Sequence, residues 1–188
     1  EQIFRSSFTM KFFWTLQVVL LLTMAVAAIH DVQAGLLGWG LLFRQLGAGT
    51  LLVFTVLIIV HEAIHGLAYK LVGAPEVSFG VNWRMLYFYA VAANFVVSRR
   101  RFIFVGLAPF VVVTIATIVA LFVAPAQLKW VLWGVLLMHT GACAGDFALL
   151  GFYEQYRHCP EMLTFDDVEN KTSWFFVREK EEAAAEAH

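Results

Sequence analysis

The chain has 188 residues, of which 61% are hydrophobic and 14% are charged, and its mean hydropathy is +0.75. Soluble domains are about 45–50% apolar and about 25% charged, so this composition excludes an ordinary soluble domain and predicts an integral membrane protein. The formal net charge is −1, and no Lys/Arg-rich run contains interleaved aromatic residues, so no nucleic-acid partner is expected. The lipid bilayer is the first partner that the sequence predicts.

Four apolar segments have about the length that a helix needs to cross a bilayer. They cover residues 12–29, 50–71, 102–123 and 130–153. We therefore predict an all-α membrane protein with about four transmembrane helices. A signal peptide is the alternative for the first segment, because Ala25-Val26-Ala27 resembles a cleavage site.

The connections between these segments differ in character. Residues 31–49 form a glycine-rich connector, and its apolar stretch at 36–43 is too short to span a membrane. Residues 75–101 form the longest loop, in which the pattern predicts short β-strands near residues 77–82 and 85–91. The basic cluster at the end of this loop, residues 98–101, is predicted to anchor lipid headgroups.

From residue 154 onward the chain becomes polar, with a possible strand at residues 173–177 and an end that resembles a cloning remnant. The predicted organisation is a transmembrane domain over residues 1–153 and a cytoplasmic tail over residues 154–188. Cys143 and Cys159 are predicted to lie too far apart for a disulfide if the last helix continues to near residue 153.

Lysine and arginine near the helix ends predict the orientation, because these residues are enriched on the cytoplasmic side. With four spans, one side of the membrane carries only Arg44 and Lys129. We therefore expect the other side, and with it both termini, to be cytoplasmic. That side carries Arg5, Lys11, Lys70, Arg84, Arg99, Arg100, Arg101 and Arg157.

The second apolar segment contains an H-E-x-x-H motif that starts at His61 and ends at His65. On a helix, residues four apart leave the same face, which is the spacing that lets two imidazoles bind one zinc ion. Glu62 is then placed to reach a metal-bound water as a general base. Each unpartnered charge opposes membrane insertion by ~2.5–3.5 kcal/mol, so ionisable groups at this depth favour a functional site over chance.

A catalytic zinc site usually has three protein ligands, so one ligand must come from outside the motif. The extended metzincin pattern would place glycine and histidine at positions 68 and 71, which are Ala68 and Leu71 here. The last apolar segment offers His139, Cys143 and Asp146 instead.

Depth in the membrane separates these three candidates. Asp146 lies about as far from the inner end of its helix as the histidine pair does, whereas His139 lies two turns, about 10 Å, further out. Gly141 and Gly145 form a small-x-x-x-small step that allows close helix approach. We predict Asp146 as the third ligand, His139 as a packing or substrate-contact residue, and Cys143 as a small buried hydrophobe.

The H-E-x-x-H motif in one transmembrane helix and Gly145-Asp146 in a later one resemble the core of the site-2 protease family of intramembrane zinc proteases. The intervening loop, the following Ala108-Pro109 and the late Gly-Asp are most similar to a bacterial membrane family described as putative zincin peptidases. The resemblance covers roughly residues 50–152. It implies a zinc cofactor and a multi-pass location in the bacterial plasma membrane.

These observations predict an intramembrane zinc metalloprotease that cleaves membrane-associated protein or peptide substrates near the cytoplasmic leaflet. His61, His65 and Asp146 would hold Zn²⁺, which lowers the pKa of a bound water, and Glu62 would accept the proton of that water. Candidate substrate contacts are Asn82, Asn94 and His139.

Two alternatives remain open from the sequence. A non-enzymatic metal-binding or transport protein would use the same ligands, although it has no evident need for Glu62. A haem-binding membrane anchor would pair His139 with His61 or His65, but the predicted depths place these histidines apart.

Overall fold

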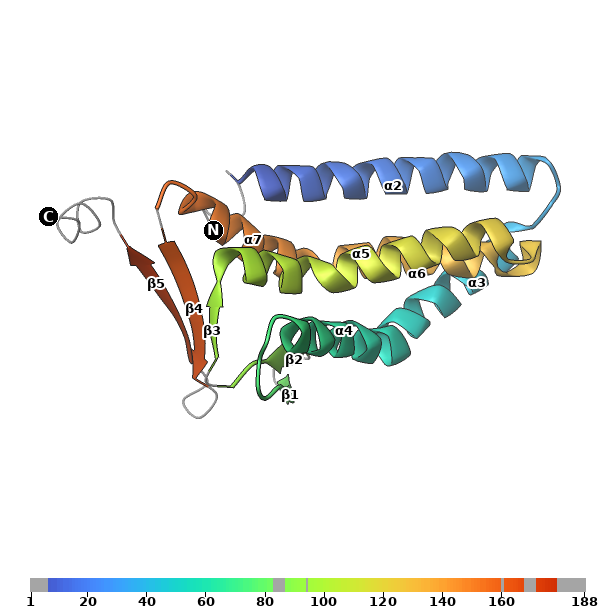
Figure 1. Ribbon diagram of the computed structural model, residues 1–188. Coiled ribbons are helices and arrows are strands. Elements are labelled where there is room, and N and C mark those ends of the chain that lie inside the picture. Colours follow the sequence, from blue (N-terminus) through green and yellow to red (C-terminus); the bar gives the residue numbers. More distant parts are fainter. Residues whose placement is uncertain (1–6, 83–86, 94, 160, 168–171, 179–188) are drawn as a thin grey trace, which may run out of the picture.

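The computed structural model describes residues 7–82, 87–93, 95–159, 161–167 and 172–178 (Figure 1). Its helical segments are α2 (Phe8–Gln33), α3 (Trp39–Leu52), the π-helical η1 (Val53–Leu57), α4 (Ile58–Leu71), α5 (Arg99–Val123), the 3-10 turn η2 (Ala126–Leu128), α6 (Lys129–Ala142) and α7 (Ala144–Gln155). Its strands are β1 (Ser78–Asn82), β2 (Tyr87–Val91), β3 (Val96–Ser98), β4 (Glu161–Asp167) and β5 (Thr172–Arg178).

Within the described residues, four helical stretches are long and apolar enough to cross a membrane. They are Phe8–Gln33, Trp39–Leu71, Arg99–Val123 and Ala126–Gln155, and we call them spans one to four. The prediction of about four spans with short strands in the loop is confirmed, and the four spans suggest a multi-pass membrane protein. The strands gather at one end of the helices, the sheet end, and the α2–α3 and α5–α6 turns lie at the opposite end, the turn end (Figure 1).

Span two is longer than the sequence predicted. After a turn at Gly35, where φ is +69°, a continuous helical path begins at Trp39, so the prediction of a connector up to residue 49 was wrong. Glycine is tolerated there because backbone groups in a membrane must find their hydrogen bonds within the helix. Gly49 also has a specific reason to lack a side chain, since a Cβ atom would collide with the Val131 carbonyl of α6.

Span four is interrupted, whereas the sequence predicted one helix over residues 130–153. At Cys143 the backbone leaves helical geometry (φ −70°, ψ 4°), and α6 ends there and α7 begins. The His139 carbonyl accepts hydrogen bonds from both the backbone N–H (3.2 Å) and the Sγ (3.3 Å) of Cys143. Cys143 and Cys159 are both free thiols, which confirms the prediction of no disulfide between them.

The strands form two small antiparallel sheets. β1 and β2 make the predicted hairpin, with Ser78 opposite Val91. The second sheet has the order β3-β4-β5, so the strand predicted near residues 173–177 finds its partner in β4. Because β3 leads directly into α5, the pairing of β3 with β4 attaches residues beyond 154 to the start of span three.

Arg99 differs from its predicted role as a lipid anchor. Its guanidinium donates hydrogen bonds to the backbone carbonyls of Tyr156 (2.5 Å), Arg157 (3.3 Å) and Cys159 (3.5 Å). A cation is favourable at the C-terminal end of a helix, where carbonyl groups lack helical partners. Arg99 therefore joins the start of α5 to the end of α7.

Candidate metal centre

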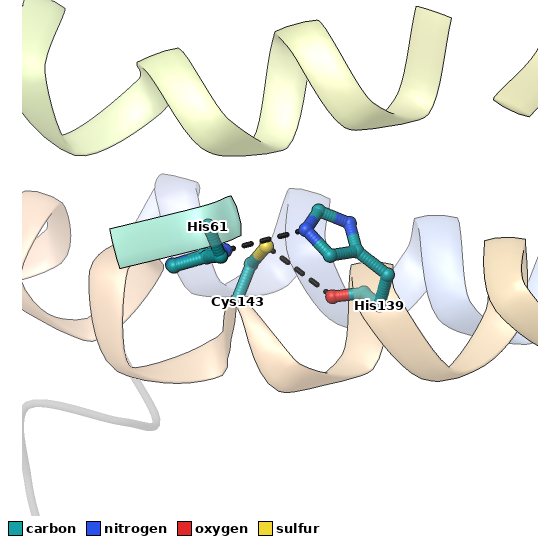
Figure 2. Close-up of side chains that lie close together, drawn as sticks. All are labelled: His61, His139 and Cys143. Atoms are coloured by element: carbon teal, nitrogen blue, oxygen red, sulfur yellow. Dashed lines mark hydrogen bonds between the residues drawn. The ribbon is translucent and has the colours of Figure 1, made fainter. Parts of the chain in front are cut away.

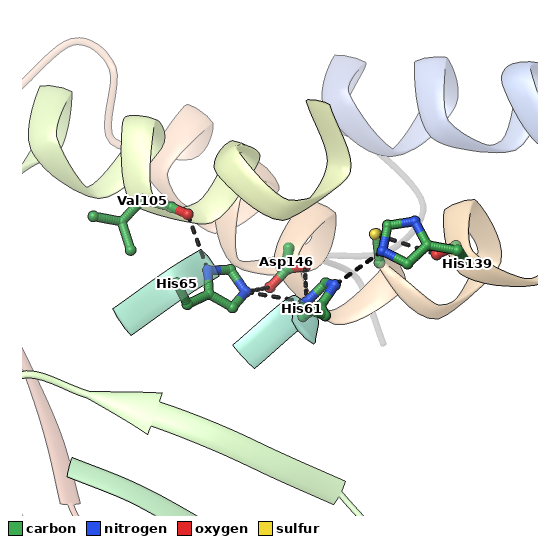
Figure 3. A network of polar contacts seen from close by, with 6 residues as sticks. His61, His65, Val105, His139 and Asp146 are labelled. Atoms are coloured by element: carbon green, nitrogen blue, oxygen red, sulfur yellow. Dashed lines mark hydrogen bonds and ion pairs between the residues drawn. The ribbon is translucent and has the colours of Figure 1, made fainter. Parts of the chain in front are cut away.

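Spans two and four bring polar side chains together near the sheet end, in an otherwise apolar interior. α4 presents His61 and His65 one turn apart, as the motif predicted, and the first turn of α7 presents Asp146. Figure 3 shows the two imidazoles and the carboxylate pointing toward one another. Both histidines are buried, each with 8% of its surface exposed.

The candidate ligand atoms, two histidine nitrogens and two carboxylate oxygens, lie close together, and the three side chains that carry them form the corners of a triangle. His61 Nε2 lies 3.1 Å from His65 Nε2, and the two Asp146 oxygens lie 3.3 Å from these two nitrogens, one each. Ligand atoms about 2.0–2.2 Å from a tetrahedral zinc ion are separated by about 3.3–3.6 Å. The triangle therefore fits a single metal ion with small adjustments, and it leaves room for a fourth ligand.

The hydrogen bond of His65 fixes which of its nitrogens faces the triangle's centre. His65 Nδ1 lies 3.0 Å from the backbone carbonyl of Val105 in α5. A carbonyl can only accept, so Nδ1 carries the proton and the neutral ring directs an Nε2 lone pair at His61 and Asp146. Metal-ligating histidines commonly have such an outer partner.

These contacts explain why the cluster favours a cation. A carboxylate and two neutral imidazoles with Nε2 lone pairs would direct only acceptors at one another, at 3.1–3.3 Å. Such groups repel unless protons or a metal ion lie between them, and buried charges in proteins are paired or bind metals. His61, His65 and Asp146 are one of two groups of described residues with ligand atoms within 4.8 Å of one another.

Glu62 lies beside this group without belonging to it. Among the described residues, neither group of close ligand atoms includes Glu62. Its carboxylate accepts a backbone hydrogen bond from Ala90 of β2, and its side chain lines a cavity next to His61 and Asp146. Glu62 thus faces the space beside the proposed ligands, as a general base would.

The cavity lies between spans two and four and has a volume of about 640 Å³. Its polar lining comes from the motif, His139 and Asp146, and the rest of its wall is apolar. Gly145 also lines it, and a Cβ atom at this glycine would meet no atom within 4 Å. The apolar part of the wall is Val53, Ile58, Phe88, Ala142, Ala148, Leu149, Phe152 and Phe175.

His139 is closer to the site than its predicted depth implied. Its Nε2 lies 3.2 Å from His61 Nδ1, so the expectation that its depth keeps it apart from His61 was wrong (Figure 2). The reason is that His61 has two ring nitrogens, and residues 139 and 146 approach it from opposite sides. His139 and Cys143 form with His61 the second group of close ligand atoms.

The two asparagines proposed as substrate contacts stay predictions. Asn82 is the last residue of β1, opposite Tyr87, and its side chain lies outside the described part of the structure. Asn94 also lies outside the described residues. Two contacts of the site had no signal in the sequence, the carbonyl of Val105 and the backbone N–H of Ala90, because any residue type supplies such groups.

Comparison with protein families matches residues 54–158 to the family described as "Putative zincin peptidase". The matched region contains the motif, His139 and Asp146. No curated protein and no solved structure matches the chain. The family and the buried cluster together suggest that the site holds a metal ion. Because the match covers more than half of the 188 residues, the chain belongs to the putative zincin peptidase family.

Proposed function

We propose that the protein is an intramembrane zinc metalloprotease, similar to the site-2 proteases, with His61, His65 and Asp146 as the zinc ligands and Glu62 as the general base. The observation that carries this proposal is the group of two histidine nitrogens, 3.1 Å apart, each 3.3 Å from a carboxylate oxygen of Asp146, beside the Glu62 carboxylate and an apolar cavity. Ordinary packing does not require two histidines and two carboxylates inside apolar spans.

Charge balance favours a divalent ion at this position. Asp146 and Glu62 together supply two negative charges in a low-dielectric interior, and the histidines are neutral as ligands. A bound Zn²⁺ would neutralise both carboxylates, lower the pKa of a water molecule and polarise the substrate carbonyl. The chain's own contribution is to hold three ligand atoms in place and to keep one position open.

Glu62 is the residue proposed to move the proton. Its carboxylate accepts a proton from the attacking water and then donates it to the leaving amine of the cleaved peptide bond. The hydrogen bond from Ala90 orients this carboxylate and connects the β1–β2 hairpin to the base. The hairpin therefore contributes to the proposed site as well as to the fold.

The cavity supports membrane-associated proteins or peptides as the substrate class. Its wall is mainly apolar, and its polar groups belong to the proposed catalytic site and to His139. An apolar segment can enter it without leaving many polar groups unpaired, although a helical substrate must unwind locally to expose a peptide carbonyl. We place the site near the cytoplasmic leaflet, with both termini in the cytoplasm of a bacterial cell.

The test compares wild-type protein with Glu62→Gln in proteoliposomes. The substrates are peptides with membrane-spanning sequences, cleavage is followed by mass spectrometry, and zinc content is measured by elemental analysis. Because Glu62 is proposed as a base and not a ligand, zinc should remain bound while hydrolysis falls by about 10²–10⁴-fold. Loss of zinc together with activity would make Glu62 a ligand.

A second result would change the proposed class of protein. If wild type binds one zinc ion per chain but cleaves none of the membrane-spanning peptides, the non-enzymatic metal-binding alternative replaces the protease. His65→Ala is the control for specific binding, because it removes one corner of the triangle and should release the metal.

A further inference from the structure

His139 is a buried imidazole for which the proposed reaction has no role. Only 3% of its surface is exposed, and it lies in the last turn of α6, next to the break at Cys143. Its ring contacts that of His61 edge to face, with centroids 5.4 Å apart. The atoms that meet are His139 Nε2 and His61 Nδ1, at 3.2 Å (Figures 2 and 3).

We propose that His139 is a positioning residue that accepts the Nδ1–H of His61 and thereby directs the Nε2 lone pair of His61 at the metal position. This inference rests on the proposed zinc site. It assigns to His61 the kind of outer partner that the Val105 carbonyl provides for His65. Such partners set the tautomer of a ligating histidine and fix its ring orientation.

The environment of His61 shows why an acceptor is needed. A neutral imidazole carries one proton, and without a partner at Nδ1 that proton would favour Nε2, where the Asp146 carboxylate lies 3.3 Å away. A proton on Nε2 would occupy the lone pair that the metal requires. Among the described residues, the hydrogen-bond partner of His61 Nδ1 is His139, so His139 favours the ligating tautomer.

The cost of burying His139 supports a role beyond packing. If Nε2 accepts, the ring keeps its own proton on Nδ1, and this atom is buried without a hydrogen-bond partner among the described residues. An unsatisfied buried donor costs stability, so an apolar side chain would pack better at this position. The hydrogen bond to His61 is the feature that an apolar residue would not supply.

The break between α6 and α7 holds His139 in place. The backbone N–H of Cys143 donates to the carbonyl of His139 at 3.2 Å, and this bond, which an alanine would keep, closes α6 one turn after His139. α7 then carries Asp146 to the other nitrogen of His61. Residues 139 and 146 therefore bracket one imidazole, with one residue proposed as its orienting partner and the other as a fellow ligand.

A competing role for His139 would be direct metal binding with Cys143. The ligand atoms of His61, His139 and Cys143 lie within 4.8 Å of one another. The two roles make different demands on Cys143, because a metal bound by this group needs the thiolate whereas positioning of His61 does not. Cys143→Ala is therefore the matched control.

The experiment measures zinc affinity by competition with a chromophoric chelator, using full-length protein in detergent. His139→Leu removes the acceptor and fills its place with an apolar side chain. We expect zinc affinity to fall about 10–100-fold. His139→Gln offers an amide oxygen as acceptor and should recover most of the loss. Cys143→Ala should bind zinc as wild type does, and thermal unfolding checks that each variant is folded.

Long-range ¹H–¹⁵N NMR of histidine-labelled protein reports the tautomer of His61 directly. The zinc-loaded wild type should carry the His61 proton on Nδ1, and the signal is assigned by its absence in His61→Ala. The proposal is overturned if His61 is protonated on Nε2, if His139→Leu binds zinc as tightly as wild type, or if His139→Gln gives no recovery. Loss of binding in Cys143→Ala would overturn it in favour of the thiolate group.

Failure of the proposed zinc site gives a different pattern. In that case the wild type binds no zinc, or His65→Ala and Asp146→Ala bind it as well as the wild type does. Failure of the positioning role alone leaves these two variants defective and His139→Leu normal.

Discussion

Spans two and four contact each other near both ends of the molecule, and the two contacts differ. Toward the turn end, α3 packs along α6 so closely that Gly49 and Gly134 each face the backbone of the other helix. Toward the sheet end, α4 packs on α5 and the β1–β2 hairpin, while α7 packs on α2 and α5. There, spans two and four are joined by the side chains of the candidate site and separated by the cavity.

This difference shows how a membrane protein can keep both a tight contact and an open site in one pair of spans. Close backbone approach gives van der Waals contact where no hydrophobic force acts between helices in lipid. The segments between the two ends depart from regular α-helix, with the π-helical η1 in span two and the break at Cys143 in span four. Such irregularities are frequent at functional sites, and here they separate the tight contact from the site.

The largest effect is expected from Asp146→Ala, which removes the carboxylate that joins the two spans at the sheet end. Zinc affinity should fall by more than about 100-fold, because loss of an outer hydrogen-bond partner alone typically lowers metal affinity by about 10–100-fold. Isothermal titration with Zn²⁺ in detergent measures this, and Cys143→Ala is the control for a change at the α6–α7 break. An unchanged affinity would mean that the metal is held elsewhere.

A smaller effect, on peptide hydrolysis and not on zinc binding, is expected from filling the cavity with Gly145→Leu. The position lines the cavity and has free space around a Cβ atom, so the variant should fold and bind zinc normally. Peptide hydrolysis should nevertheless fall by about 10²-fold, because a displaced substrate loses its alignment with the catalytic groups. Gly47→Leu is the control, since a Cβ atom at Gly47 also meets nothing within 4 Å and this residue does not line the cavity.

The tight contact can be tested with Gly49→Ala. The added methyl group would collide with the backbone of α6 at Val131 and Val135, and overpacking of this kind costs about 1–3 kcal/mol of the free energy of unfolding. SDS-induced unfolding measures the change. Gly47→Ala in the same helix should be neutral or stabilising, because alanine favours helix and meets no neighbour there. Equal effects of the two variants would contradict a glycine contact between the spans.

The sequence predicted the spans and the histidine motif because both depend on local pattern. Apolar length identifies a span, and the i, i+4 spacing places His61 and His65 on one face whatever surrounds them. The proximity of Asp146 was also expected, from depth in the membrane, and the structure places it 3.3 Å from both histidines. Its role as a ligand remains a prediction.

The rest depends on tertiary contacts that no local pattern encodes. The connector at residues 31–49 was misjudged because its glycines indicate a loop. One of them, Gly49, is instead required by close packing against α6, a helix distant in the sequence. The position of His139 was misjudged because a difference in depth was taken to mean separation from His61. Distance along an axis does not show that one imidazole is approached from both sides.

The smallest effect is expected from Glu154→Gln. This variant tests whether the start of α2 can be weakened without disturbing either contact between spans two and four. The Glu154 carboxylate accepts hydrogen bonds from the backbone N–H groups of Phe8 (3.1 Å) and Thr9 (3.0 Å), and from the hydroxyls of Ser7 (2.7 Å) and Thr9 (2.8 Å). It thus caps the start of α2 from the end of α7. A glutamine keeps one acceptor oxygen but turns an amide donor toward groups that already donate.

The expected loss for Glu154→Gln is about 1 kcal/mol, as for other lost N-caps. Hydrogen exchange followed by mass spectrometry should show faster exchange in the first turns of α2. Near this cap, α2 contacts span four through Met10 and Phe13, which pack against Cys143 and Phe147. Because neither Cys143 nor Phe147 lines the cavity, zinc affinity should stay at the wild-type level. A fall in zinc affinity would instead show that α2 supports the α6–α7 break and, through it, the positions of His139 and Asp146.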